Sequence, residues 1–142
     1  MKNVLITSNS FYNLYNFRYN LIKLLAKNSK INLFAENDKY KLKFKNDYFK
    51  CTNLDYKSRS YNPLENLNLL KKIINLQKKN KFDTILTFTI KPNFFYSLLR
   101  YFFNFHLIVT ITGLGEIFIN KSLKNNIISY IYTKILNNAD TI

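Results

Sequence analysis

Residues 107–116 read LIVTITGLGE and join an apolar run to the only two glycines of the chain, Gly113 and Gly115. A continuous apolar run of this length is typical of a strand that is covered on both faces in a parallel sheet. Glycine tolerates positive φ and allows a ligand or another backbone segment to approach closely. We therefore predict a strand over 105–112 that ends in a tight turn, with both glycines at a ligand-binding edge.

Outward from this stretch, short apolar runs alternate with amphipathic ones. We predict four further strands, at 3–8, 30–35, 48–54 and 82–89. We predict helices at 14–28, 63–79, 92–103 and 121–138, and a short helix or a loop at 39–46. Asn13 and Asn62 are the expected N-caps, with Pro63 and Pro92 at the first helical positions. The last residues, ADTI (139–142), resemble the start of another strand. This alternation indicates an α/β fold, an open parallel sheet with helices on both faces.

The composition is strongly basic. The 142 residues include 22 Lys and Arg against 8 Asp and Glu, a formal net charge of +14, and 47% of them are hydrophobic. The apolar fraction is enough for a folded core, which excludes a disordered segment. The charge attracts acidic lipid surfaces, phosphorylated substrates or other polyanions, unless the lysines only fill the surface. The single cysteine, Cys51, permits no internal disulfide and fits a reducing cytosol.

Residues 94–112 are the one stretch with membrane-like hydropathy. Arg100, Asn104 and His106 interrupt it, and a spanning helix needs roughly 20 mostly apolar residues, so we predict a helix followed by a strand. The predicted helix at 92–103 is apolar almost all round. It is either a core helix or a helix that lies with its apolar face against a membrane.

In open parallel sheets, ligands bind beyond the carboxyl ends of the strands. The residues that follow the predicted strands are rich in hydroxyls and amides, with one lysine, Lys91, and no histidine. Lys91 precedes a helix N-terminus that could hold a phosphate, or it is a solvated lysine. Arg18 could point to the same edge or only cover the surface of its helix. His106 starts its strand, at the opposite edge, and is expected to be structural.

No catalytic constellation is recognisable in the sequence. The glycine run lacks the third glycine of a dinucleotide fingerprint, because Phe118 occupies that position, and it lacks the G-K-[ST] of a P-loop. No cluster of His, Cys, Asp and Glu has metal-ligand spacing. We therefore assign no catalytic residue, no metal and no cofactor.

Three stretches in this order and spacing resemble the N-terminal half of bacterial family 4 glycosyltransferases of the GT-B fold: NSFYNLYNFRYNLIKLLAKN (9–28), FTIKPNFF (88–95) and TITGLGEIF (110–118). The pattern is most similar to that of enzymes that add an N-acetylhexosamine or a similar sugar to an undecaprenyl-diphosphate-linked acceptor in surface polysaccharide or glycan synthesis. The resemblance covers essentially the whole chain. It implies a Rossmann-like domain that binds the acceptor at the inner face of the cytoplasmic membrane, and a transfer that retains the anomeric configuration without a metal.

The resemblance also implies a set of residues that line the acceptor cleft. Carried over by position, they are Asn13, Tyr15, Asn16, Arg18, Thr89, Lys91, Asn93, Thr112, Gly113 and Gly115. The nucleotide-sugar donor is held in this family by a C-terminal domain with an E-x7-E motif. Because Glu36, Glu65 and Glu116 do not have that spacing, we expect the 142 residues to be a single acceptor-binding domain, truncated, with the donor-binding domain absent. Transfer would then need a partner chain that supplies it.

Two other hypotheses stay open at this point. The first is a non-catalytic basic module that binds anionic membrane or nucleic acid, and it rests on the charge alone. Because no recognition-helix, RRM or KH signature appears, we expect no nucleic-acid partner. The second hypothesis is a nucleotide-binding domain in which Glu36 hydrogen-bonds a ribose hydroxyl. The missing third glycine of the dinucleotide fingerprint counts against it.

Overall fold

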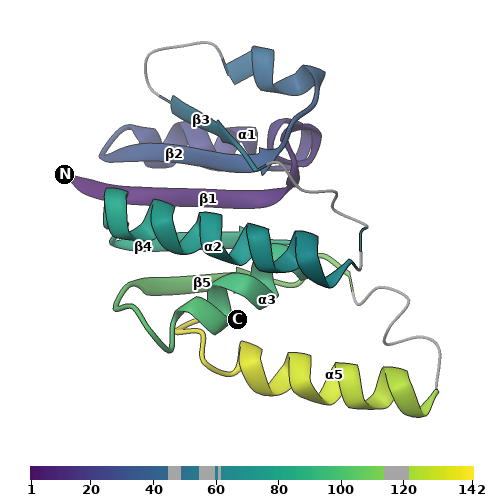
Figure 1. Ribbon diagram of the computed structural model, residues 1–142. Helices are drawn as coiled ribbons and strands as arrows, with labels where there is room; N and C mark the ends of the chain where they lie inside the picture. The colour runs from purple at the N-terminus through teal and green to yellow at the C-terminus, as the bar shows by residue number, and fades with distance from the viewer. Residues whose placement is uncertain (45–48, 55–59, 61, 114–121) are drawn as a thin grey trace.

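The first strand of the chain lies at the centre of the sheet. The computed structural model describes residues 1–44, 49–54, 60, 62–113 and 122–142. Within these residues, five parallel strands are ordered β3-β2-β1-β4-β5 (Figure 1). Their bounds are β1 Lys2–Ser10, β2 Ser29–Glu36, β3 Phe49–Asn53, β4 Thr84–Phe88 and β5 His106–Thr110.

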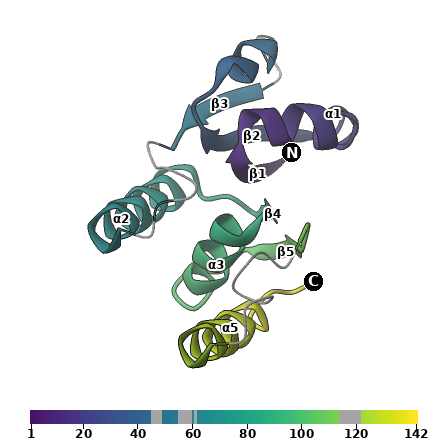
Figure 2. The same ribbon diagram turned by 90° about the vertical axis from the view of Figure 1, so that its right-hand side faces the viewer.

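Helices cover both faces of this sheet, as Figure 2 shows along the strands. On one face lie α1 and a 3-10 helix, with the bounds α1 Phe11–Ala26 and η1 Lys39–Phe44. On the other face lie three helices, α2 Pro63–Asn80, α3 Ile90–Leu99 and α5 Leu123–Leu136. The α/β fold with an open parallel sheet, predicted from the alternation of strands and helices, is therefore confirmed.

The core has two layers because side chains alternate across a strand. On β1, Leu5 packs toward α2 and α3, whereas Ile6 packs toward α1, and both are fully buried. In the first layer, α3 and α5 meet through the stacked rings of Phe94 and Tyr132, whose centroids are 6.4 Å apart. Burial of apolar side chains on both faces explains why the strands have nearly continuous apolar sequences.

Two predicted helix boundaries were wrong. Helix α1 begins at Phe11 and is capped by Ser10, whose Oγ accepts a hydrogen bond from the N–H of Asn13 at 3.2 Å, so Asn13 is not the cap. Helix α3 begins at Ile90, which places Pro92 inside its first turn, and it ends at Leu99. The start of α2 was predicted correctly, with Asn62 as the cap.

Helix α3 is a core helix. Six of its ten residues are buried: Pro92, Asn93, Phe95, Tyr96, Ser97 and Leu99. The alternative in which its apolar face lies against a membrane is therefore wrong. The exposed rings of this segment lie just after the helix, at Tyr101 and Phe102. In the described part of the chain, no helix combines the length and the apolarity needed to cross a bilayer.

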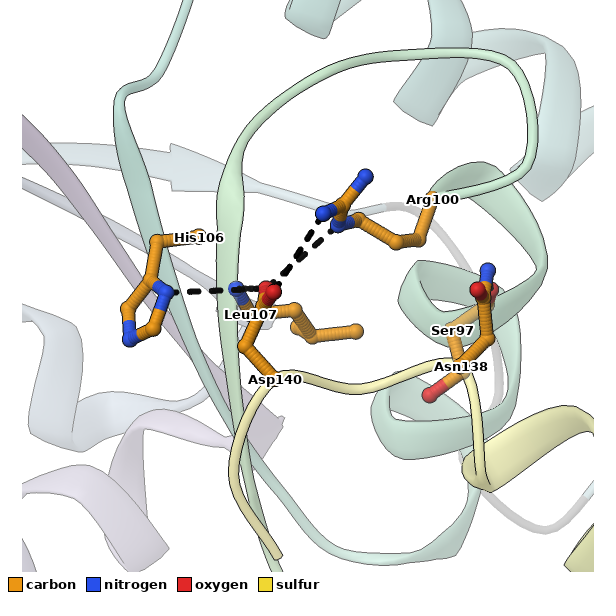
Figure 3. Close-up of polar contacts among 6 residues, drawn as sticks. All are labelled: Ser97, Arg100, His106, Leu107, Asn138 and Asp140. Atoms are coloured by element: carbon orange, nitrogen blue, oxygen red, sulfur yellow. Dashed lines mark hydrogen bonds and ion pairs between the residues drawn. The ribbon is translucent and has the colours of Figure 1, made fainter.

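The end of the chain is fastened to the start of β5 by Asp140 (Figure 3). Its carboxylate accepts hydrogen bonds from Arg100, at 3.3 and 3.4 Å, and from the backbone N–H of Leu107 at 2.7 Å. His106 lies 3.6 Å away through Nδ1, in the structural role expected for it. Thr141 then forms a parallel bridge with Ile108, as predicted for a strand beginning there.

Candidate functional site

The loops after β1, β2, β4 and β5 all leave from one edge, because the strands are parallel. Phe88 and Thr110, the last residues of β4 and β5, are register partners. The corner at Thr89–Lys91 and the turn at Thr112–Gly113 therefore follow neighbouring strands. The shared rim that the sequence predicted for these two segments is present.

Thr89 has the most unusual backbone at this rim. Its φ of 74° and ψ of 158° lie in a region that is almost restricted to glycine. The carbonyl of Thr89 accepts a hydrogen bond from the N–H of Asn93 at 3.1 Å, while its buried Oγ1 has no partner within the described residues. Strain of this kind persists only where the surrounding structure enforces it, and it is common in active sites and ligand clamps.

Gly113, by contrast, shows no strain. A Cβ atom at this position would meet nothing within 4 Å among the described residues, and its φ lies outside the left-handed range. The expectation of a positive φ at this glycine is therefore wrong, whereas the close approach of a ligand stays a prediction. Gly113 and Thr112 are exposed at the rim. Gly115 lies outside the described residues.

Asn93 is a buried residue that hydrogen-bonds the backbone beneath the rim. It is only 1% exposed, and its Nδ2 donates a hydrogen bond to the carbonyl of Thr110 at 3.1 Å. Its side chain also hydrogen-bonds Tyr132 of α5. Burial raises the pKa of Tyr132 more than this bond lowers it. Asn93 thus connects β4, β5 and α5, and it acts on the site through the backbone that it positions.

Lys91 is anchored across the rim. Its Nζ donates to the carbonyl of Ser60 over 2.6 Å, and burial lowers its pKa, although the charges of Glu65 and Glu36 act in the opposite direction. The ammonium group therefore lies in a partly desolvated position near two carboxylates. It is not the fully solvated lysine of the alternative interpretation.

Arg18 reaches the same part of the edge from α1. Its guanidinium lies 4.6 Å from the ring centroid of Phe88, the last residue of β4, and Nη1 donates to the carbonyl of Phe17 at 3.2 Å. The Nε atom is buried and has no hydrogen-bond partner in the described structure. Arg18 therefore lies at the ligand edge and is not simply a surface residue of its helix.

The remaining predicted residues lie further along α1. Asn13 donates its backbone N–H to the Ser10 cap, and Asn16 donates its side-chain amide to the carbonyl of Tyr12 at 3.0 Å. Tyr15 packs against Tyr19 and against η1. The structure thus groups Arg18, Thr89, Lys91 and Asn93 around the end of β4. It places Tyr15 against η1 and Asn16 on the exposed surface of α1.

Sequence reasoning missed two buried hydroxyls. Thr7 and Thr87 are register partners in β1 and β4, both are fully buried, and the Oγ1 of each has no partner among the described residues. Unsatisfied buried polar groups are rare and often mark functional sites. Threonines within otherwise apolar strands were the only signal in the sequence.

The described residues contain no group of three or more His, Cys, Asp or Glu suited to a metal ion. The described side chains at the rim are cationic or hydrogen-bonding: Lys91, Arg18, and the hydroxyl and amide groups around them. Such groups suit a ligand that carries phosphate and several hydroxyls.

Comparison with known proteins agrees with this architecture. Residues 3–142 match the family described as glycosyl transferase 4-like, whereas a search of curated proteins gave no match. The sucrose-phosphate synthase of Thermosynechococcus elongatus superposes with a TM-score of 0.67 at 16% identity, over 99% of this chain and 41% of that one. MurG of Acinetobacter baumannii superposes with a TM-score of 0.64 at 11% identity, over 99% of this chain and 40% of that one.

At these identities, the structural likeness concerns the fold alone, and the chain spans less than half the length of either protein. The family match is independent of that likeness and extends over nearly the whole sequence. The chain therefore belongs to the glycosyl transferase 4-like family.

Proposed function

We propose that these 142 residues form the acceptor-binding domain of a retaining glycosyltransferase. The enzyme would transfer a hexosyl or N-acetylhexosaminyl unit from a nucleotide-sugar to a lipid-linked glycan acceptor in surface polysaccharide or glycan synthesis. The observation that carries the proposal is the position of Arg18, Thr89 and Lys91 around the carboxyl end of β4, in a chain that belongs to this family.

The two cations at this edge suit the diphosphate of a polyprenyl-diphosphate-linked acceptor. The Lys91 ammonium is partly desolvated, and electrostatic attraction is stronger where water is excluded. The guanidinium of Arg18 offers the planar donor fork that matches phosphate oxygens. Thr112 and Gly113 are exposed on the adjacent rim, where sugar hydroxyls can reach them. We assign these residues to binding and none of them to the chemical step.

The donor half of the reaction belongs to another part of the enzyme in this proposal. A nucleotide-sugar-binding domain from polypeptide outside these 142 residues would close over the carboxyl edge of the sheet. The donor is a substrate, and neither a metal nor a cofactor is proposed. Without that domain the chain would bind acceptor and leave the sugar donor unused.

Two surface features support a peripheral position on the inner face of the cytoplasmic membrane. The net charge is +14, which favours anionic lipid. Helix α5 also exposes large apolar side chains: Leu123, Ile127, Ile128, Tyr130 and Ile131. Basic proteins with an exposed apolar helix face bind at the membrane interface without crossing it.

Flotation with three kinds of vesicle tests the proposal. One kind is neutral, one contains an anionic phospholipid, and one contains an undecaprenyl-diphosphate-linked saccharide at the same surface charge. We expect the chain to bind the third kind most tightly, and Lys91→Met to remove that excess. Lys79→Met is the matched control, since Lys79 is an exposed lysine in the last turn of α2, away from the apolar face of α5.

Equal binding to the two charged vesicles would overturn the acceptor assignment. It would instead favour the alternative that the +14 charge supports, a non-catalytic basic module for anionic membrane or nucleic acid. A gel shift at increasing salt then identifies a nucleic-acid partner, because binding to phosphate backbones weakens steeply with salt.

A further inference from the structure

The corner between α1 and η1 carries an ordered group of aromatic side chains that the proposed function does not use. Tyr12 and Tyr40 meet edge to face, with centroids 5.0 Å apart and an interplanar angle of 82°. Tyr15 lies 5.9 Å from Tyr40. Together with Lys39 and Lys43, these three tyrosines are called the tyrosine platform below.

The platform has a rigid base. Phe44 is 2% exposed, and its ring lies 5.7 Å from that of Tyr15 and 6.1 Å from that of Phe11. Tyr12, on the outer side, is 47% exposed. Tyr12 therefore presents aromatic surface to solvent, while Tyr15 and Tyr40 are partly buried against the core beneath it.

Asp38 fixes the two outer tyrosines relative to each other. One carboxylate oxygen accepts the backbone N–H of Tyr12 at 2.8 Å, and the other accepts the backbone N–H of Tyr40, also at 2.8 Å. A single side chain thus joins the start of α1 to the start of η1. A binding surface gains affinity from such pre-organisation, because less conformational freedom is lost when the ligand arrives.

Two ammonium groups lie over these rings. Lys43 Nζ is 5.0 Å from the centroid of Tyr15 and 5.5 Å from that of Tyr40, and Lys39 Nζ is 5.7 Å from that of Tyr40. Both lysines are exposed. Cation–π contact holds a lysine in a defined place while its N–H donors stay available to a ligand.

The start of α1 and the segment after β2, which carry the platform, both lie at the carboxyl edge of the sheet (Figure 1). Tyr12 follows the end of β1 by two residues and Asp38 follows the end of β2 by two residues. Those strand ends, Ser10 and Glu36, are register partners. A ligand of more than one sugar bound at the rim after β4 would extend across β1 toward this corner.

We propose that the tyrosine platform is a saccharide subsite for a pyranose that carries a negative charge, either on the sugar itself or on its diphosphate linkage. The C–H face of a pyranose packs against an aromatic ring, and the two ammonium groups pair with a carboxylate or a phosphate beside it. The inference rests on the proposed function, in that the saccharide is part of the acceptor.

Calorimetric titration of the 142-residue chain tests the subsite with soluble probes. They are an N-acetylhexosamine joined by diphosphate to a short alkyl chain, a disaccharide that contains a uronic acid, the matching neutral disaccharide and a single-stranded oligonucleotide. We expect one or both charged saccharides to bind more tightly than the neutral one. Binding of only the first identifies the diphosphate as the anionic group, and binding of only the second identifies the sugar carboxylate.

Substitutions at the platform locate the binding. Lys43→Gln and Tyr12→Ala are expected to weaken binding of the charged saccharide by roughly three- to tenfold, since an exposed cation or ring contributes a modest contact. Lys134→Gln is the matched control, because Lys134 lies 6.0 Å from the ring of Tyr130 on α5, away from the platform. Circular dichroism verifies that each variant is folded. If Tyr12→Ala is unstable, Lys43→Gln alone tests the subsite, because Lys43 is exposed.

The outcomes separate this inference from the function on which it rests. Saccharide affinity that is unchanged in both platform variants overturns the subsite and leaves acceptor binding at the β4 rim intact. No saccharide binding by the wild-type chain overturns the proposed function and the subsite together. Tighter binding of the oligonucleotide than of every saccharide overturns the ligand assignment.

Discussion

Asn93, in the first turn of α3, donates a side-chain hydrogen bond to the carbonyl oxygen of Thr110 at the end of β5, over 3.1 Å. The two residues are 17 positions apart and belong to neighbouring strand–helix units. This bond adds to the pairing of Phe88 with Thr110 and fastens the corner after β4 to the end of β5. The candidate rim is therefore supported by one buried amide, which cannot itself reach the ligand because it is 1% exposed.

Asn93→Leu should destabilise the chain. The substitution keeps the branched shape of the side chain, with added bulk, and leaves the Thr110 carbonyl without this donor, a loss expected to cost about 1–3 kcal/mol of unfolding free energy. Urea unfolding followed by circular dichroism measures it. Asn16→Leu removes an exposed amide that bonds within α1, and its effect should stay within about 0.5 kcal/mol. Equal losses in the two variants would contradict a special role for Asn93.

Thr89→Gly should stabilise the chain, although glycine usually destabilises. Thr89 has a φ of 74°, and relief of such strain is worth about 1–3 kcal/mol, against about 0.5–1 kcal/mol for the added freedom of the unfolded chain. We expect a net gain of about 1 kcal/mol in thermal unfolding. Thr112→Gly, at an exposed position without positive φ, is the control and should give no gain. A lower melting temperature for Thr89→Gly would show that the contacts of the Thr89 side chain stabilise the fold by more than the strained backbone destabilises it.

The fold could be predicted because its signals are local. The dipeptide Asn62-Pro63 specifies the start of α2 by itself, and in the structure the Asn62 side chain accepts the N–H of Leu64 at 3.0 Å. Strands buried on both faces show themselves as apolar runs, and helices as 3.6-residue periods. Neither signal requires knowledge of distant residues.

The start of α1 could not be predicted in this way. Both Ser10 and Asn13 are good N-caps. The choice depends on how far β1 extends, and β1 stays paired with β2 up to Ser10, opposite Glu36. Because that pairing is a tertiary contact, it cannot be predicted from the residues around Ser10 and Asn13.

The candidate site was predictable only in part for the same reason. Arg18 and Lys91 are at the expected edge, but the sequence directed attention to the glycines, whereas the strained backbone is at Thr89, a residue that normally avoids this conformation. Asp38 shows the limit most clearly. It fixes Tyr12, 26 positions earlier, through a contact that exists only once β1 and β2 are paired.

Asp140 should make stability depend on pH in the acid range. Its pKa is lowered, first by the hydrogen bonds from Arg100 and then by that from the N–H of Leu107. A carboxyl of this kind stabilises the folded chain above its unfolded pKa, about 3.9, and the contribution is lost as pH falls through the lower folded value. Asp140→Asn should therefore cost about 1 kcal/mol at neutral pH and progressively less below about pH 4.

Urea unfolding of the wild type and Asp140→Asn across this range measures the difference. The side chains of both partners are partly exposed, at 26% for Arg100 and 29% for Asp140, so the effect should also shrink in high salt. A difference in stability that is constant between neutral and acid pH would show that the charge of Asp140 contributes nothing.

Cys51, in β3, should react slowly with alkylating reagents. Burial raises the pKa of its thiol to about 11, against a smaller opposing effect from the charge of Lys41. Because the thiolate is the reactive form and an unfolded thiol has a pKa of about 8.5, iodoacetamide at about pH 8 should modify the folded chain roughly a hundredfold more slowly than the urea-unfolded chain. Mass spectrometry after timed quenching gives the alkylation rates of the folded and the unfolded chain. Equal alkylation rates for the folded and the unfolded chain would contradict this prediction. They would mean that β3 separates from β2 faster than the thiol is modified.

The raised pKa of Cys51 also affects stability. As pH rises, the unfolded chain loses the thiol proton before the folded chain does, so the folded state should lose stability above about pH 8.5.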